Sequence, residues 1–251
     1  MTKRLKLGMI GGGQGAFIGA VHRLCARMDD KYEFVAGCLS STPEKAAKSA
    51  VEIGLHPSRS GAAGGVGDIG SHTMHLLEFI TQLKLQSVSA DLTTFVEGRK
   101  LDDDASIMIR LNNGAKGSLS ISQVATGEEN NFTVAIYGDK GALKWSQENP
   151  NYATFSQVGE SSQIITRGGS IKVEGTEANV RIPAGHPEGY LEAFAQIYSD
   201  AADVIQNKEN KEELLKILPN IDDGLHIMKF INASVESSNN DSAWTDLSTI
   251  K

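Results

Sequence analysis

Residues 5–16 read LKLGMIGGGQGA, and this stretch decides the fold of the N-terminal part of the chain. Residues 5–10 form a short, mostly apolar run that predicts a β-strand. Residues 11–16 fit the pattern G-x-G-x-x-G/A, with Ala16 in the last place. From Phe17 onward, apolar residues recur at the spacing of one helical face. The sequence therefore predicts a strand, a glycine turn and a helix in succession.

A second strand and a second helix are predicted next. Residues 33–39 read EFVAGCL, which is typical of a buried strand. Thr42 and Pro43 then give a favourable N-cap and first position for a helix that extends to Leu55. Strand, glycine turn, helix, strand and helix is the order that a dinucleotide-binding unit requires.

The glycine turn is the predicted binding site of a dinucleotide. Glycines let the backbone approach a pyrophosphate closely, and a helix N-terminus offers it free N–H groups. The predicted cofactor-binding residues of the turn are Gly11, Gly13, Gln14, Gly15 and Ala16. The alternative interpretation is a tight strand-to-helix turn that holds no ligand.

The end of the second strand bears on the choice of cofactor. The acid that usually holds the ribose 2′-hydroxyl is missing there, and Ser40 and Ser41 stand in its place. Small hydroxyl side chains do not repel a 2′-phosphate, so NADP is at least as admissible as NAD. Alternatively, both serines simply belong to a helix-capping turn.

The third parallel strand of such a unit does not appear where it is due. After Leu55 the chain continues with HPSRSG and a glycine-rich stretch, neither of which has the apolar run of a strand. Two parallel strands are too few for an independently stable sheet. We therefore expect residues 1–55 to be the front part of a Rossmann dinucleotide-binding domain and residues 56–251 to form a second domain.

Residues 64–72 read GGVGDIGSH and lead into an apolar stripe that begins at Met74. Glycines allow tight backbone approach, and Asp68 and His72 follow at i and i+4, so on a helix both point from one face. The stretch is predicted to be a rigid helical platform that presents titratable groups for catalysis. The alternative is that Asp68 caps the helix and that His72 is an ordinary, partly buried histidine.

The apolar pattern over residues 88–166 has period two, which predicts a series of antiparallel strands. Asn113 with Gly114 marks one hairpin, and short connections leave no room for crossover helices. Two later helices, with apolar stripes that begin at Tyr190 and Leu225, are predicted to pack on one face of the sheet. The predicted fold class is α/β: a partial N-terminal Rossmann unit plus a C-terminal α/β domain with a large, mostly antiparallel sheet packed by helices.

Composition limits the partners and the compartment. The chain has 251 residues, and its formal net charge of -7 argues against nucleic acid or an anionic membrane as a partner. Cys25 and Cys38 lie in apolar segments and make no disulfide framework, so buried thiols are expected. The N-terminal residues resemble neither a signal peptide nor a membrane span, and a cytoplasmic location is expected.

Residues 11–16 with the strand before them, and residues 64–72 with the helix after them, resemble the Gfo/Idh/MocA family of glucose-fructose oxidoreductase, inositol dehydrogenase and MocA-like proteins. Residues 185–190, GHPEGY, look like a segment found in some sugar-active members. The resemblance implies an N-terminal Rossmann domain and a C-terminal α/β domain. Because the sheet of that second domain commonly serves subunit assembly, a homo-oligomer is expected.

One departure from the family concerns its catalytic lysine. The family carries that lysine in a Glu-Lys-Pro or Asp-Lys-Pro motif, whereas Glu44 and Lys45 are followed here by Ala46. Compared with the family, on the order of a hundred residues are missing between Leu55 and His56, where the later strands of the doubly wound sheet would be. This agrees with the two-strand unit inferred above from the residues alone.

The resemblance gives His72 the role of acid or base on a substrate hydroxyl or carbonyl while hydride moves to or from nicotinamide. Its unperturbed pKa near ~6.5 suits proton transfer at neutral pH, and Asp68 would orient the imidazole or bind a hydroxyl. His186 is implied to line the substrate site, although it can also be a loop histidine placed by the neighbouring proline and glycines. Asp68, His72 and His75 could instead face a metal from one helix side, but no second cluster supplies a further ligand, and no metal is predicted.

The sequence thus predicts an NAD(P)-dependent oxidoreductase that acts on a sugar, a polyol or a related hydroxyl or carbonyl compound. Because its cofactor domain is shortened, we expect little or no turnover from the chain as written. The alternative is a non-catalytic remnant that serves as an oligomerising β-sheet module.

Overall fold

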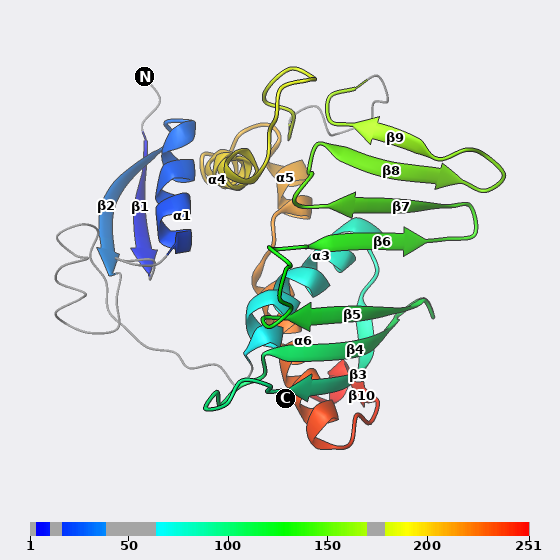
Figure 1. Ribbon diagram of the computed structural model, residues 1–251. Helices are drawn as coiled ribbons and strands as arrows, with labels where there is room; N and C mark the ends of the chain where they lie inside the picture. Colours follow the sequence, from blue (N-terminus) through cyan, green and yellow to red (C-terminus); the bar gives the residue numbers. More distant parts are fainter. Residues whose placement is uncertain (1–3, 11–16, 39–63, 170–178, 251) are drawn as a thin grey trace. The chain divides into compact units, whose positions relative to one another are not determined.

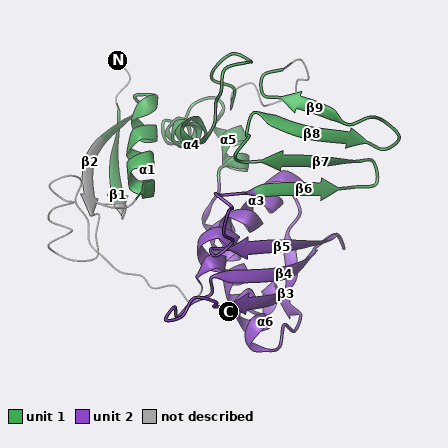
Figure 2. Cartoon of the chain, in the orientation of Figure 1, with its two compact units in different colours: residues 1–59, 133–218 green, residues 60–132, 219–251 purple. Residues whose placement is uncertain are grey.

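The structure is a computed structural model that describes residues 4–10, 17–38, 64–169 and 179–250 (Figure 1). The chain divides into two compact units (Figure 2): unit 1 comprises residues 1–59 and 133–218, and unit 2 comprises residues 60–132 and 219–251. The expected boundary between residues 55 and 56 lies outside the described residues. The division into domains 1–55 and 56–251 therefore stays a prediction.

Unit 1 begins with two parallel strands joined by a helix, as the N-terminal sequence predicts. These elements are β1 (Leu5–Ile10), α1 (Phe17–Met28) and β2 (Tyr32–Cys38). Val21 and Cys25 of α1 pack against Ala195 of α4 (Tyr190–Ile205), and all three side chains are buried. The Cys25 thiol donates a hydrogen bond to the Leu191 carbonyl at 3.2 Å, and burial raises its pKa. The side chain of Cys38 lies outside the described residues.

Unit 1 also contains a four-stranded antiparallel sheet and a short helix. Its elements are β6 (Thr133–Tyr137), β7 (Gly141–Ser146), β8 (Tyr152–Gln157), β9 (Gln163–Thr166) and α5 (Lys211–Ile217). Because side chains alternate between the faces of a strand, the observed pairing collects apolar residues on one face. These half-buried residues are Val134, Ile136, Leu143, Trp145, Phe155 and Ile165.

Unit 2 has a second four-stranded antiparallel sheet, in the order β10-β3-β4-β5, with helices that pack on its apolar side chains. Its elements are η1 (Val66–Gly70), α3 (Ser71–Thr81), β3 (Leu85–Thr93), β4 (Asp104–Leu111), β5 (Lys116–Ser122), α6 (Ile221–Asn239), β10 (Thr245–Asp246) and η3 (Leu247–Thr249). Along β4 burial alternates, so Ile107 and Ile109 enter the core while Met108 is exposed. Phe230 and Ile231 of α6 and Met74 of α3 complete this core.

The mixed α/β class and the antiparallel pairing are confirmed, with two differences of detail. In the described part of the chain, the hydrogen bonds group the antiparallel strands into two sheets of four rather than one larger sheet. The apolar residues of α4 also pack on α1 and on the parallel pair β1–β2: Phe194 lies beside Val21 of α1, and Tyr198 and Ala202 cluster with Tyr32 of β2. The period of a helical stripe shows which face is apolar but does not identify the element that covers it.

None of the described helices combines the length and the apolar character that crossing a membrane requires.

Candidate functional site

The platform predicted at residues 64–72 forms a helix, but its first turn is a π-helix. The turn is η1, Val66–Gly70, and α3 continues from Ser71 without a break. The Ser71 N–H donates to the carbonyl oxygen of Val66, five residues earlier. Single π-turns inside α-helices are rare and often occur at functional sites.

The carboxylate of Asp102 fixes the start of this turn. It accepts hydrogen bonds from the Gly64 N–H at 2.6 Å and from the Val66 N–H at 2.8 Å, while the Gly65 N–H donates to the Asp102 carbonyl at 2.9 Å. The first N–H groups of a helix have no partner inside the helix, so a buried carboxylate there satisfies them. Asp102 is 9% exposed. The helix start is therefore capped by a residue from the segment before β4, and Asp68 is not the cap.

The glycines of the platform allow close packing. A Cβ on Gly64 would come within 2.2 Å of the Asp102 carbonyl oxygen, and a Cβ on Gly70 would come within 2.9 Å of the Ile121 Cδ1 atom on β5. Real Cβ atoms do not approach other heavy atoms so closely. Gly64 and Gly70 thus let the turn lie directly on its neighbours in unit 2.

Asp68 and His72 both reach the surface of unit 2 from this packed turn. The Gln123 side chain, just after β5, donates from Nε2 to Asp68 Oδ2 at 3.4 Å, and its own N–H donates to the Asp103 carbonyl at 2.7 Å. Within residues 64–169, no hydrogen bond joins Asp68 to His72. The role of these two side chains in catalysis stays a prediction, and their exposure leaves them accessible to a ligand.

Asp103 holds the neighbouring loop in the way that Asp102 holds the turn. Its fully buried carboxylate accepts from the N–H groups of Phe95 and Val96 and pairs with Arg99. The Phe95 and Val96 hydrogen bonds, together with the Arg99 charge, outweigh burial and keep the pKa of Asp103 below its ordinary value. Two consecutive acidic residues therefore anchor two different segments at the start of β4.

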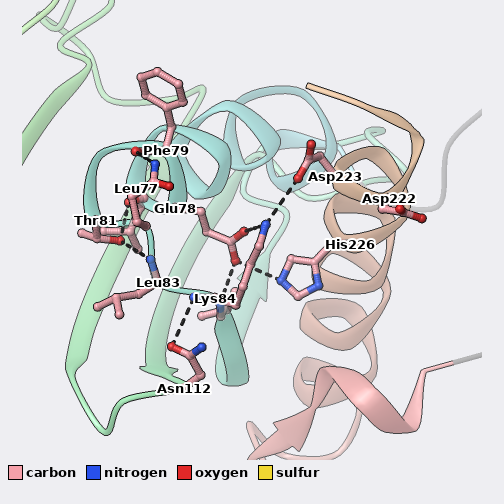
Figure 3. Close-up of polar contacts among 12 residues, drawn as sticks. Leu77, Glu78, Phe79, Thr81, Leu83, Lys84, Asn112, Asp222, Asp223 and His226 are labelled. Carbon is pink, nitrogen blue, oxygen red and sulfur yellow. Dashed lines mark hydrogen bonds and ion pairs between the residues drawn. The ribbon is translucent and has the colours of Figure 1, made fainter. Parts of the chain in front are cut away.

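The far end of α3 is held by a second polar cluster (Figure 3). Glu78 is buried, and its carboxylate accepts from the Leu85 N–H at 2.7 Å, from Lys84 Nζ at 2.9 Å and from His226 Nε2 at 2.9 Å. Lys84 also reaches Asp223 of α6 at 3.3 Å. Burial by itself would raise the pKa of Glu78, but these donors outweigh it and the pKa lies below its ordinary value. The cluster joins α3, β3 and α6, which makes it a structural element of unit 2.

The alternative metal site on α3 gains no support. His75 is half-buried and His72 is exposed. Over the ranges that the structure describes, no three His, Cys, Asp or Glu side chains come together in a way that could hold a metal ion.

The predicted cofactor residues lie outside the described residues. Gly11, Gly13, Gln14, Gly15 and Ala16, and likewise Ser40 and Ser41, fall in this group. The structure does describe what flanks the glycine turn: β1 ends at Ile10, α1 begins at Phe17, and β1 pairs in parallel with β2. A strand, a turn and a helix followed by a parallel strand is the frame in which a dinucleotide pyrophosphate binds at the helix N-terminus. The described frame therefore fits a dinucleotide.

His186 lies in unit 1, in the loop before α4, where it is exposed and lines a cavity of about 570 Å³. Its imidazole Nδ1 lies 3.3 Å from the Pro183 carbonyl oxygen, and its own carbonyl accepts from Arg167 at 2.6 Å. Asp68 and His72 belong to unit 2. The predicted role of His186 as a substrate-binding residue stays a prediction, now with a cavity beside it.

Sequence reasoning missed Asp102, Gln123 and Arg167. Asp102 belongs to a run of three acids directly before a predicted strand, and such a run usually indicates solvent rather than a buried cap. Gln123 and Arg167 carry no motif, and their partners are far away in the sequence: Gln123 contacts Asp68, and Arg167 contacts His186. Only the folded structure brings these residues together.

Comparisons with known proteins agree with this architecture. The family model of the GFO/IDH/MocA C-terminal domain matches residues 18–144. The protein named "Uncharacterized oxidoreductase YfiI" of Bacillus subtilis is 30% identical over 197 residues, which cover 76% of this chain and 50% of that protein. The chain thus spans about half the length of this curated relative.

Solved structures extend the likeness to nearly the whole chain. The crystal structure of an oxidoreductase from Sinorhizobium meliloti has a TM-score of 0.85 and 34% identity, and the match covers 97% of this chain and 99% of that one. An inositol dehydrogenase homolog from Azotobacter vinelandii, complexed with NAD+, has a TM-score of 0.84 and 19% identity, covering 98% of both chains. At that identity the second match shows the fold alone. By its family model and its structural likeness, this chain belongs to the Gfo/Idh/MocA family of oxidoreductases.

Proposed function

We propose that the chain is an NAD(P)-dependent oxidoreductase that acts on a sugar, a polyol or a related hydroxyl or carbonyl compound by hydride transfer. The observation that carries the proposal is the π-turn of unit 2, which is anchored by Asp102, packed through Gly70 and presents Asp68 and His72 at the surface. A rigid turn that exposes an acid and an imidazole is the arrangement that positioned proton transfer requires.

His72 takes or gives the proton at the reacting oxygen of the substrate. Asp68, one turn earlier, orients the substrate hydroxyl or the imidazole, and Gln123 holds the Asp68 carboxylate by its 3.4 Å contact. His186 is the proposed substrate-binding residue of unit 1.

The cofactor is a nicotinamide dinucleotide, which when bound supplies the hydride donor or acceptor. The glycine turn, Gly11 to Ala16, would hold its pyrophosphate, and Ser40 and Ser41 would face its adenosine ribose. Support comes from relatives: the Azotobacter vinelandii inositol dehydrogenase homolog has been solved with NADH and myo-inositol, and a levoglucosan dehydrogenase with NADH and levoglucosan. Ser40 and Ser41 leave both NAD and NADP open.

The turnover of this chain is proposed to be slow. The family lysine of the Glu-Lys-Pro motif has no counterpart here, because Ala46 follows Lys45. The front part of a Rossmann domain, without its later strands, offers fewer contacts to a dinucleotide. We therefore expect binding to be easier to detect than turnover.

Titration of the purified chain with NADPH and, separately, with NADH, followed by nicotinamide fluorescence, tests the cofactor assignment. Saturable binding of at least one of them is the expected result, and no binding of either up to millimolar concentration would contradict the proposal for this chain. For any dehydrogenase turnover that is measured, His72→Asn should abolish it. The control is His75→Asn on the same helix, which should leave the turnover close to that of the parent chain. Equal losses in both variants would refute the assignment of His72.

Assembly and compartment complete the proposal. The half-buried apolar face of the sheet β6–β9 supports a homo-oligomer that forms through a sheet. A cytoplasmic location fits the thiol of Cys25, which is buried and unpaired with another cysteine in the described residues. The alternative of a non-catalytic oligomerising module finds no support in the relatives, which are named as oxidoreductases and dehydrogenases.

A further inference from the structure

Helix α6 of unit 2 carries apolar side chains on two opposite faces. Phe230 and Ile231 enter the core of the unit. On the outward face, Ile221, Leu225 and Met228 are 85%, 55% and 52% exposed. The sequence predicts that the apolar stripe beginning at Leu225 packs on a sheet, and for Leu225 and Met228 this prediction is wrong.

The three exposed residues form one continuous surface, here called the α6 stripe. Ile221, Leu225 and Met228 follow one another at spacings of four and three, so they lie on one face of the helix. Isolated exposed apolar residues are common on protein surfaces, whereas a contiguous apolar patch marks an interaction site. The α6 stripe is therefore a candidate docking surface.

Asp222 and Lys229 border the α6 stripe along one edge. They are seven residues apart, which is close to two helical turns, so both project from the same side of the helix. Figure 3 shows Asp222 pointing away from the Glu78 cluster. Neither Asp222 nor Lys229 takes part in an ion pair within the residues that the structure describes. An acid at one end of the stripe and a base at the other thus await partners.

This pattern is complementary to itself when a second copy of the helix runs antiparallel. In a two-fold interface, residue i of one copy meets residue j of the other, and j meets i. The midpoint between Ile221 and Met228 and the midpoint between Asp222 and Lys229 both fall beside Leu225. A two-fold axis at Leu225 therefore places Ile221 on Met228 of the second copy. It also keeps each edge of the stripe on its own side, so that Asp222 meets Lys229.

A parallel pair of helices does not offer this match. Parallel helices in register bring each residue against itself, so Asp222 would face Asp222 and Lys229 would face Lys229. Like charges at such contacts repel one another. The charges at the edge of the stripe therefore select the antiparallel arrangement and fit an occupant that carries the same pattern.

We propose that the α6 stripe docks a second copy of this chain, as an antiparallel α6–α6 pair about a two-fold axis at Leu225. Two ion pairs between Asp222 of one copy and Lys229 of the other fix the register. This interface differs from the apolar face of the sheet β6–β9. It depends neither on cofactor binding nor on turnover, so it goes beyond the proposed function.

Sedimentation velocity of the full chain over a range of concentrations tests the pairing through its charges. Asp222→Lys alone and Lys229→Asp alone should each raise the dissociation constant of the pair about tenfold, because each creates two like-charge contacts. An equimolar mixture of the two variants should restore the parent affinity, since each then meets opposite charges on the other. Glu236→Lys is the control: Glu236 is exposed on α6, about 16 Å along the helix from the axis, and should leave the affinity unchanged.

Disulfide formation between copies locates the axis directly. Leu225→Cys is introduced together with Cys38→Ser, so that the buried Cys25 is the other remaining thiol. In the antiparallel pair the two copies of residue 225 are about 2 Å apart along the helix, whereas the two copies of residue 236 are about 30 Å apart. Because a disulfide needs its Cα atoms within about 7 Å, mild oxidation should link Leu225→Cys into a covalent dimer and leave Glu236→Cys unlinked on a non-reducing gel.

Three results would overturn the proposal: no covalent dimer of Leu225→Cys, equal yields from Leu225→Cys and Glu236→Cys, or a mixture of the two charge variants that associates no better than either alone. A second copy that docks only through the sheet β6–β9 would give the first result. Circular dichroism of each variant confirms that it is folded.

Discussion

Glu78 illustrates, at the scale of a single residue, how a buried charge becomes part of the fold. Its carboxylate has three donors, from Lys84, Leu85 and His226, and its side chain is 6% exposed. A buried charge is costly unless it is paired and hydrogen-bonded, and here both conditions are met. The residue therefore contributes to stability only while it is ionised.

The pH dependence of Glu78 follows from the direction of its pKa shift. The folded-state pKa lies below the ordinary value of 4.5, so ionised Glu78 stabilises unit 2 above about pH 4.5. That contribution is lost as the pH falls through the lower, folded-state pKa. We expect Glu78→Gln to lower the free energy of unfolding by about 1–3 kcal/mol at pH 7 and by less at pH 3.

Urea unfolding at pH 7 and at pH 3 measures this difference. Glu236→Gln is the control, because Glu236 is exposed on α6 and should change the stability little at either pH. A Glu78→Gln variant that is as destabilised at pH 3 as at pH 7 would refute the role of the ionised carboxylate.

Residue identity alone was informative where a side chain acts locally and misleading where it acts through distant partners. The burial of Cys25 is confirmed, since the thiol packs between α1 and α4. By contrast, Asp102 has the appearance of a solvated acid in the sequence. In the structure it caps a helix start, and its partners Gly64 and Val66 lie 38 and 36 positions earlier in the chain. Burial of a charge depends on the donors that the fold brings to it, and these are not adjacent in sequence.

At the scale of an element, the π-turn η1 decides how the platform of residues 64–72 presents its side chains. The sequence predicts a helix over residues 64–72, and the structure confirms a helix there but widens its first turn. Gly70 lies against Ile121 of β5 and Phe230 of α6, so the turn packs on a strand and a helix of unit 2. The glycines, which predicted tight backbone approach, serve close packing here.

Gly70→Ala should therefore destabilise the chain. The added methyl group would lie 2.9 Å from Ile121 Cδ1, and overpacking of a buried site typically costs about 1–3 kcal/mol. Gly224→Ala on α6 is the matched control, because its Cβ meets nothing within 4 Å. Alanine there should stabilise the helix by up to about 1 kcal/mol. Thermal melts of both variants should shift in opposite directions, and shifts of the same sign would contradict this account.

Element boundaries followed the apolar pattern closely. The last strand of the series predicted over residues 88–166 is β9, which ends at Thr166, and the Asn113-Gly114 hairpin joins β4 to β5 with Gly114 at a φ of 88°. Two short elements, β10 and η3, were not predicted, because two or three residues show no periodicity. The local apolar pattern was sufficient to predict the longer helices and strands. It did not predict which of these elements pack against one another, because the fold decides that.

The two units have separate apolar cores, which matters at the scale of the whole molecule. Ile107 belongs to a cluster made entirely of unit 2 residues, and Val21 belongs to a cluster made of unit 1 residues. A large-to-small substitution that leaves a cavity in one cluster removes contacts mainly from the unit that contains this cluster. Local stability is therefore expected to change unit by unit.

Ile107→Ala should lower the stability of unit 2 by about 2–5 kcal/mol, because Ile107 is 1% exposed. Hydrogen exchange with mass spectrometry should show the largest loss of protection within residues 64–132 and 219–250, and a smaller change in unit 1. Met108→Ala is the control from the same strand, since Met108 is 53% exposed. An equal loss of protection in both units after Ile107→Ala would contradict the separation of the cores.

The sequence by itself determined the class of this protein: the strand, glycine turn and helix of residues 5–28, the period-two strands from residue 88 onward and the family resemblance. These follow from short-range patterns, because backbone geometry sets the period of buried residues. The tertiary structure alone decided that Asp102 caps the platform, that α4 covers α1 and that Arg167 and Glu188 pair in the lining of a cavity. Each of these depends on burial and pairing between residues far apart in the chain, which local pattern does not encode.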